Sequence, residues 1–244
     1  MSRSNPCLPR PCRTHPCLTF APLAWLKLQY FCHAGGTEVG GFGIAAEDDL
    51  LYVEDFVTVR QEATPLSVRF LDEAVADFFD GCVDAGLKPQ RFSRLWCHTH
   101  PADSVTPSAT DEETFARSFG GCDWAVMFIL GRTGRTYARL TFRAGPGGDL
   151  LLPTRVDWST WPCWLDGTPG TLDEHFARWR DEYVAHVQAL PTSLRPLPPE
   201  LLDAYAEDPT WWDGLPYGHE LDEAAFAPAK GNAPQESIHE PHPF

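Results

Sequence analysis

Apolar and polar residues follow strand-like and helix-like patterns in turn along the first part of the chain. Three apolar stretches, separated by glycine or acidic turns, predict successive strands at residues 23–32, 39–46 and 50–59. Apolar residues then recur at spacings of three and four, which is typical of an amphipathic helix ending near Gly86. The members of that apolar stripe are Leu71, Ala74, Val75, Phe78, Phe79 and Cys82.

A second group of elements follows this helix. Residues 92–98 read as a strand that ends in a polar loop, and a short helix is expected to begin near Ser108. Residues 124–130 and 135–142 predict a hairpin. The alternation predicts an α/β (α+β) domain in which helices flank a sheet, with a core that closes at residue 142.

The rest of the chain is richer in proline and tryptophan. Residues 171–190 predict one helix, in which Thr171 and Glu174 form a capping box, and we expect the last part of the chain to be mobile. Three tryptophans before this helix could form a binding platform, but aromatic residues at this density usually pack an extension onto the core: Trp158, Trp161 and Trp164. The sequence therefore divides into a disordered proline- and cysteine-rich leader at 1–18, a domain at 19–144 and an extension at 145–244.

Composition excludes several classes of protein. The 244 residues are 43% hydrophobic, which is enough for one sizeable core. With 19 Lys and Arg against 34 Asp and Glu, the net charge is −15, so nucleic acid is not expected as a partner. No apolar run approaches the roughly 20 residues that span a bilayer, so no membrane partner is expected.

The eight cysteines indicate a reducing compartment. They are too few for a disulfide-dense scaffold in a chain of this length, and five of them fall in stretches that look structured. Cys7, Cys12 and Cys17 repeat every five residues in the leader, which matches neither a CxxC zinc pattern nor a secretory signal. We therefore expect a reduced, cytoplasmic protein.

The chemistry is concentrated between His98 and Asp111. Residues two apart on a strand point to the same face, so His98 and His100 can offer two imidazoles to one ion. Ten residues separate His100 from Asp111, enough for a loop to return and for the next helix to aim a carboxylate at that ion. Two nitrogens and one oxygen leave a fourth tetrahedral position for water, as in catalytic zinc sites.

A hydrolytic site of this kind also needs a base. Zinc lowers the pKa of its bound water to about 7, but cleaving an amide requires a group that carries a proton to the leaving nitrogen. A carboxylate beside the metal, but not bound to it, does this in metalloproteases. Glu38, at the start of a predicted strand, is the candidate.

These residues resemble the motif of the JAMM (JAB/MPN+) metalloprotease family. That motif has an early Glu, then His-Ser/Thr-His-Pro, then Pro-Ser-x-x-Asp, and this chain matches it with Glu38, residues 98–101 and residues 107–111. The resemblance covers roughly residues 22–142, about half of the chain.

The resemblance implies a cytidine-deaminase-like MPN/JAB fold with a mixed, curved sheet, and a zinc ion held by His98, His100 and Asp111. It implies that Glu38 is the general acid and base and that Ser108 helps to stabilise the oxyanion, which suits a hydroxyl donor near the metal. Family members cleave isopeptide or peptide bonds at the C-terminal tail of ubiquitin or ubiquitin-like proteins. This chain looks like the bacterial members that accompany activating- and conjugating-enzyme-like proteins.

Simpler interpretations of the same residues remain open. Ser108 and Asp111 also suit a helix start, as the N-cap and as an acid near the positive end of the helix dipole, although capping does not explain the two histidines upstream. Glu38 stands where a glutamate is usually just solvated. His175 and His186 are expected to lie on the surface of the C-terminal helix, without a role.

Other functions share the motif. A peptidase that releases a short tail from a sulfur-carrier protein, or acts on small peptides, uses the same chemistry on a different partner. RadC-like proteins associated with DNA repair have a similar histidine loop, but the net charge of −15 and the missing helix-hairpin-helix leader argue against them. A scaffold with a dead site is disfavoured because all the metal ligands are present.

Overall fold

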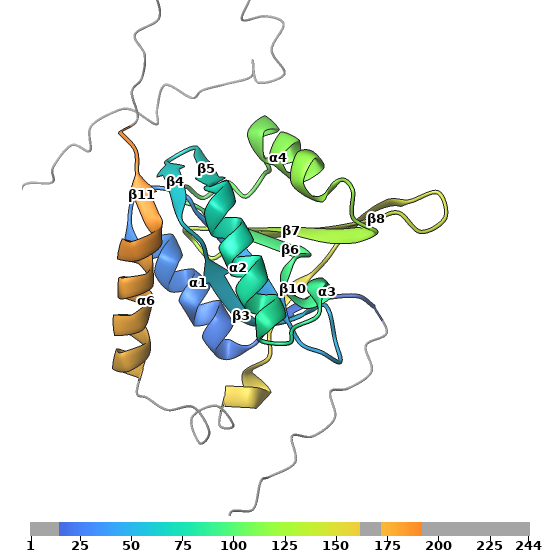
Figure 1. Ribbon diagram of the computed structural model, residues 1–244, viewed down its shortest axis with the longest axis horizontal. Helices are drawn as coiled ribbons and strands as arrows, with labels where there is room; N and C mark the ends of the chain where they lie inside the picture. Colours follow the sequence, from blue (N-terminus) through green and yellow to red (C-terminus); the bar gives the residue numbers. More distant parts are fainter. Residues whose placement is uncertain (1–14, 162–171, 192–244) are drawn as a thin grey trace, which may run out of the picture. The chain divides into compact units, whose positions relative to one another are not determined.

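A curled sheet of eight strands runs through the residues that the computed structural model describes, 15–161 and 172–191 (Figure 1). In sheet order the strands are β10 (Thr154–Val156), β1 (Leu18–Phe20), β3 (Tyr52–Thr58), β2 (Val39–Ala45), β6 (Leu95–His100), β7 (Trp124–Gly131), β8 (Thr136–Phe142) and β9 (Gly148–Leu151). β6 runs parallel to β7 and antiparallel to β2, so the sheet is mixed. The expected mixed α/β architecture is confirmed.

A second sheet joins segments from two distant parts of the chain. In the described residues it has three strands, in the order β11 (Val187–Ala189), β4 (Gln61–Thr64) and β5 (Ser67–Phe70). β4 and β5 form an antiparallel hairpin, whereas β11 pairs with β4 in parallel. The end of the described chain is thereby tied to the hairpin that follows β3.

Helices cover both faces of the large sheet (Figure 1). They are α1 (Pro22–Ala34), α2 (Asp72–Asp84), α3 (Pro89–Phe92), α4 (Ala109–Phe119) and α6 (Leu172–His186), with a 3-10 helix η1 (Trp158–Thr160) after β10. Leu95 and Cys97 of β6 belong to the core under α1 and α6, and Trp96 belongs to the core under α2 and α4. Because residues two apart share a face, His98 and His100 lie on the α2–α4 side with Trp96.

The prediction of a strand at residues 23–32 is wrong, because this segment is α1. Pro22 stands in its first turn, where a helix does not need the missing N–H. The outer side of α1 is apolar because α6 covers it: the ring centroid of Tyr30 lies 5.8 Å from that of Phe176 and 5.9 Å from that of Trp179. A helix that is apolar on both sides lacks the polar stripe that distinguishes it from a buried strand.

The other elements predicted before residue 142 are confirmed, with small shifts. The strands at 39–46 and 50–59 are β2 and β3, the amphipathic helix is α2, and the hairpin is β7–β8. Gly86 follows α2 with a φ of 78°, a conformation that glycine adopts easily at helix ends. The strand expected at 92–98 starts later, because Phe92 ends α3 and β6 continues to His100.

The large sheet continues past the boundary that we placed at residue 144. The turn after β8 contains Gly145 and Gly147, with φ values of 60° and 71°, and leads into β9. β10 then pairs with β1 at the other edge of the sheet. Segments of the predicted extension therefore form both edges, and the core does not close at residue 142.

The helix predicted in the extension is confirmed for most of its length. α6 covers residues 172–186, and the last residues of the predicted helix form β11 instead. Leu18, which we placed in the leader, begins β1. The rest of the leader up to residue 14, Trp164, Thr171 and the chain after residue 191 lie outside the described residues.

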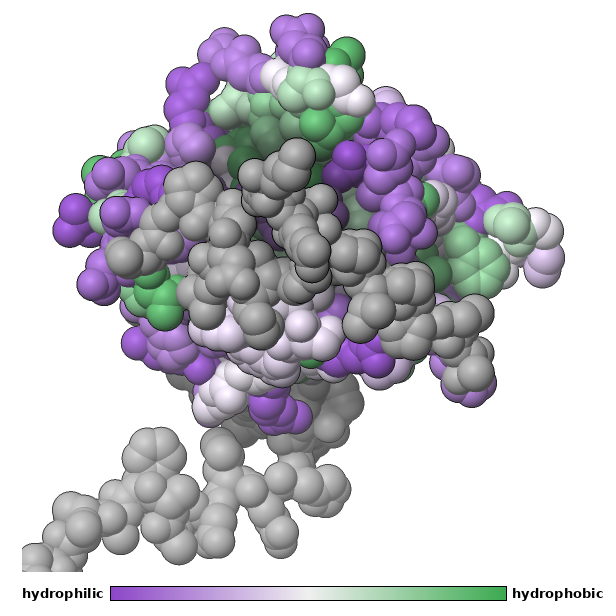
Figure 2. Space-filling model, turned by 90° about the horizontal axis from the view of Figure 1, so that it is seen from below, coloured by the Kyte–Doolittle hydropathy of each residue, from purple (hydrophilic) through white to green (hydrophobic). Residues whose placement is uncertain are grey.

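Hydrophobic side chains reach the surface at the β8–β9 hairpin, which projects on the right in Figures 1 and 2. Leu150 and Leu151 of β9 are 40% and 67% exposed. In the described ranges, no helix combines the length and the apolar character needed to cross a membrane. Cys32, Cys82, Cys97 and Cys122 are free thiols.

Candidate metal centre

The two histidines of the motif stand at the end of β6, a strand that is buried along its whole length. His98 lies across from Gly40 of β2 and from Ile129 of β7, so neighbouring strands fix its backbone on both sides. His100 is the last residue of the strand. The period of two puts both imidazoles on one face, and their ring centroids are 5.1 Å apart.

Asp111 reaches the same place from the first turn of α4, where it forms a capping box with Ser108. The backbone N–H of Asp111 donates to Ser108 Oγ at 3.1 Å. The N–H and hydroxyl of Ser108 both donate to Asp111 Oδ2, at 2.7 and 2.8 Å. With Oδ2 held in this way, Asp111 Oδ1 faces His98. The helix-start interpretation and the ligand interpretation of this motif are therefore compatible.

Glu38 precedes β2, and residues of β4 hold the backbone at Glu38 and at Gly40. The N–H of Glu38 donates to the carbonyl of Thr64 at 2.9 Å. The side chain of Gln61, which is 1% exposed, accepts from the N–H of Gly40 and donates to its carbonyl, both at 2.8 Å. A Cβ on Gly40 would approach the ring of Phe70 to 2.7 Å, so any larger residue would require that ring to shift.

Glu38, His98, His100 and Asp111 converge into one group, which we call the metal-site cluster. One possible ligand atom from each residue lies within 4.8 Å of the others. His98 Nε2 is 3.3 Å from Asp111 Oδ1, and His100 Nε2 is 3.7 Å from both Asp111 Oδ2 and Glu38 Oε1. Two ligands of a tetrahedral zinc ion are separated by roughly 3.4 Å at bond lengths of about 2.0–2.1 Å, so these distances suit a shared ion.

Unpartnered polar atoms in the metal-site cluster also fit a metal ion. Within the described part of the chain, His98 Nε2, His100 Nε2 and Glu38 Oε2 are buried and have no hydrogen-bond partner of acceptable geometry. Buried polar atoms without partners are costly and uncommon in proteins. A cation held by both imidazoles would satisfy the two nitrogens, and Glu38 Oε2 would remain available for a proton.

The tautomer of His100 suits a ligand. Its Nδ1 lies 2.8 Å from the carbonyl oxygen of Ser104. A carbonyl oxygen only accepts, so Nδ1 carries the proton and Nε2 presents its lone pair to the metal-site cluster. A hydrogen bond of this kind is the usual way in which proteins orient a metal-binding histidine.

The protonation of the metal-site cluster follows from its burial. Burial raises the pKa of Glu38 from 4.5 to about 7, with the charge of His100 lowering it and that of Asp111 raising it. Burial lowers the pKa of His98, against the opposing pull of Asp111, which favours the neutral imidazole that binds metals. Burial acts to raise the pKa of Asp111, but hydrogen bonds from His100 and His98 hold it well below its ordinary value.

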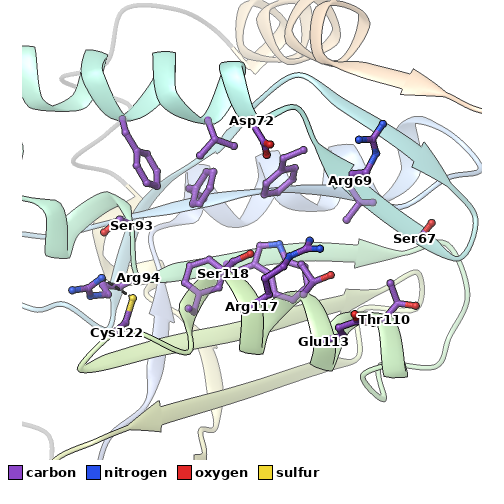
Figure 3. Close-up of a pocket in the computed structure, with 18 residues that line it drawn as sticks. Ser67, Arg69, Asp72, Ser93, Arg94, Thr110, Glu113, Arg117, Ser118 and Cys122 are labelled. Atoms are coloured by element: carbon purple, nitrogen blue, oxygen red, sulfur yellow. Dashed lines mark hydrogen bonds between the residues drawn. The ribbon is translucent and has the colours of Figure 1, made fainter.

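A groove of about 940 Å³ runs beside the metal-site cluster, between α2 and α4 (Figure 3). None of the four cluster residues lines this α2–α4 groove, but Trp96 does, and its ring stacks on that of His98 at 4.4 Å. Ser67 and Arg69 of β5 lie at one end, and Arg94 and Cys122 lie at the other (Figure 3). Much of the lining is apolar, from Phe42, Val68, Phe70, Val75, Phe79, Trp96 and Phe119.

The structure thus brings together Glu38, His98, His100 and Asp111, with Ser108 hydrogen-bonded to Asp111. His175 and His186 lie elsewhere, on α6. His175 is buried rather than on the surface as expected, and His186 Nδ1 lies 2.8 Å from Thr58 Oγ1.

Sequence reasoning missed several residues around the metal-site cluster. Trp96 could have been found, because it precedes His98 by two residues and so shares its face. The carbonyl of Ser104 and the side chain of Gln61 carry no such signal, because backbone acceptors and buried amides have no characteristic spacing.

No protein-family model matches this chain, and no curated protein matches it significantly. The functional argument therefore depends on the residues of the site.

Proposed function

We propose that this chain is a zinc-dependent isopeptidase or peptidase with an MPN/JAB fold, which cleaves after the C-terminal tail of a ubiquitin-like protein. The observation that carries the proposal is the metal-site cluster, in which two imidazole nitrogens and two carboxylates meet in a buried place. Two histidines and one carboxylate, with one position left open, are typical of catalytic zinc sites, whereas structural zinc sites are closed and richer in cysteine.

Each residue of the metal-site cluster has a distinct role in this proposal. His98, His100 and Asp111 would hold the ion, which would supply a Lewis acid that activates water. Glu38 would take a proton from the attacking water and pass it to the leaving nitrogen. In the metal-free chain, burial raises the pKa of Glu38 to about 7, so this carboxyl can hold or release a proton near neutral pH. Ser108 orients Asp111, and a role in stabilising the oxyanion stays a prediction.

The α2–α4 groove supports an extended peptide as substrate. β5 is the edge strand of its sheet in the described residues, and all four of its residues line the groove. An extended tail can pair with such an edge through main-chain hydrogen bonds, while its side chains contact the apolar lining. Glycine at the cleavage point would let the tail's backbone approach the metal closely.

The direct test is cleavage of linear fusions in which ubiquitin-like proteins ending in glycine are followed by a reporter domain. We expect the zinc-loaded full chain to cut once, after the ubiquitin-like tail, and a chelator to abolish the cut until zinc is restored. His100→Ala should be inactive, whereas His33→Ala, a matched change at an exposed histidine, should cleave normally. Cleavage that persists in His100→Ala would reject the site.

A further inference from the structure

Arg139 of β8 connects the large sheet to the turn that carries Asp111. Its two terminal nitrogens, Nη1 and Nη2, each donate to one carboxylate oxygen of Glu112, both at 2.7 Å. Glu112 follows Asp111 in the first turn of α4. The side chain of Arg139 is only 15% exposed, and this two-point contact fixes direction as well as distance.

The same guanidinium also contacts an aromatic stack that ends at His98. Its central carbon lies 5.5 Å from the ring centroid of Phe115, on the next turn of α4. Phe115 stacks with Trp96 at 6.3 Å between centroids, and Trp96 stacks with the imidazole of His98 at 4.4 Å. Arg139 is therefore linked to two members of the metal-site cluster. Its ion pair with Glu112 leads to Asp111, and its contact with Phe115 leads through Trp96 to His98.

We infer that Arg139 is a positioning residue for the metal centre, which sets the separation between Asp111 and His98. The inference rests on the proposed metal binding. Asp111 Oδ1 and His98 Nε2 are 3.3 Å apart, close to what a shared zinc ion requires, and such sites tolerate displacements of only about 0.5 Å. Without the ion pair between Arg139 and Glu112, α4 can shift on the sheet, and the distance between Asp111 Oδ1 and His98 Nε2 is no longer fixed.

The alternative is that this ion pair only stabilises the fold, and affinity separates the two roles. Loss of residues that orient metal ligands typically weakens metal binding about 10- to 100-fold. A purely structural pair lowers the unfolding temperature of the metal-free protein but leaves the zinc affinity of the folded protein unchanged. Arg139→Lys keeps the charge and loses the planar two-point contact, so a positioning role predicts weaker binding in this variant too.

The experiment is a zinc titration of the chelator-stripped full chain against a competing chromophoric chelator, below the unfolding temperature of every variant. We expect Arg139→Met and Arg139→Lys to bind zinc about 10-fold more weakly than the wild type. The cobalt(II)-loaded variants should also show altered visible absorption bands, which report the geometry around the ion.

Arg91→Lys is the matched control. Arg91 also pairs with a glutamate, Glu54, and the two side chains are 21% and 44% exposed, against 15% and 46% for Arg139 and Glu112. Its contacts lie at the Ala45 end of β2, away from Glu38. We expect its zinc affinity and cobalt spectrum to match the wild type.

Two results would overturn the inference alone: wild-type zinc affinity in both folded Arg139 variants, or an equal loss in Arg91→Lys. Wild-type protein that binds no zinc would overturn the proposed function as well. If Arg139→Met does not fold, Arg139→Lys decides between the two roles.

Discussion

Each member of the metal-site cluster is held differently, and this decides what substitutions do. His100 is oriented by the carbonyl of Ser104, Asp111 by its capping box, and His98 by stacking on Trp96. Glu38 has no comparable side-chain contact among the described residues, and its Oε2 is unpartnered. A group that moves protons must be free to change partners, so this looser arrangement suits the role proposed for Glu38.

Replacing Glu38 with Gln removes the proton acceptor while keeping the shape of the side chain. We expect zinc content to stay at the wild-type level and the cleavage rate of the fusion substrate to fall by about 10²–10⁴-fold, the usual contribution of general acid–base catalysis. Elemental analysis and rate measurements on the same preparation check both parts. Full activity in a zinc-loaded Glu38→Gln protein would exclude Glu38 as the base.

The same variant tests the burial of Glu38 in metal-free protein. Its pKa is raised from 4.5 to about 7, so the folded state holds this proton more tightly than the unfolded state. The associated stability is fully present below pH 4.5 and is lost as the pH rises through 7. Relative to Glu38→Gln, the wild type should lose roughly 3 kcal/mol between these limits. Denaturant unfolding at several pH values, in chelator, measures this difference, and a difference that does not change with pH would contradict it.

Much of the metal-site cluster could be predicted from sequence because its geometry is local. The strand period places His98 beside His100, and the helix start after Ser108 turns Asp111 inward. Glu38 was a weak candidate until the family motif supported it, because its position depends on Thr64 and Gln61 of another strand. Arg139 and Glu112 lie 27 residues apart in different elements, and no local pattern predicts such a pair.

Among the elements, α6 and β11 hold the part of the fold that carries Glu38. β11 pairs with β4, and the carbonyl of Thr64 in β4 accepts from the N–H of Glu38. α6 is fixed in turn by Glu182, whose carboxylate accepts from the N–H and hydroxyl of Thr58 at 3.0 and 2.9 Å. Glu182 Oε2 also forms an ion pair with Nζ of the buried Lys27 of α1, at 2.8 Å.

Loss of Glu182 should therefore be costly. Among the carboxylates that pair with Lys27 in the described residues, Glu182→Ala leaves only the more distant Asp55, at 3.6 Å, although the side chain of Lys27 is just 8% exposed. Removing one partner of a buried pair costs a few kcal/mol, and partial exposure of Glu182 reduces this to about 2–4 kcal/mol. Denaturant unfolding of Glu182→Ala and of the wild type measures this loss of stability.

Glu47→Ala is the control, because its pair with Lys88 is exposed on both sides, at 70% and 66%. We expect it to cost much less than Glu182→Ala, because exposed ion pairs contribute little to stability. Similar losses in the two variants would mean that the contact between α6 and the sheet contributes little.

The elements that sequence misassigned share one cause. α1 was predicted as a strand because α6 covers its outer side. The domain boundary was placed too early, at residue 144, because β9 and β10 are short, with only four and three residues. Both errors concern packing between segments far apart in the chain. Hydrophobic periodicity predicts which face of an element is buried, but not which distant segment covers it.

At the scale of the whole molecule, the two hydrophobic cores lie on opposite faces of the large sheet, and only one of them adjoins the metal-site cluster. α1 and α6 brace one face of the large sheet, while the α2–α4 face carries the metal-site cluster and the groove. A ligand that binds only the folded chain must stabilise all of these elements together.

Zinc should therefore raise the stability of the whole described fold. At free zinc about 1,000 times its dissociation constant, the gain is about 4.1 kcal/mol. Thermal unfolding with and without zinc checks this in wild type and in His100→Ala, where the shift should vanish. An equal shift in His100→Ala would indicate that zinc binds elsewhere.

The most direct test of the account is anomalous X-ray diffraction from crystals of the zinc-loaded chain, recorded on both sides of the zinc absorption edge. We expect one strong peak, at about 2.0–2.1 Å from Nε2 of His98 and of His100 and about 2.0–2.2 Å from Asp111 Oδ1, with Glu38 nearby but not bound. No peak at this position, or a peak bound by Glu38 as a fourth protein ligand, would contradict it.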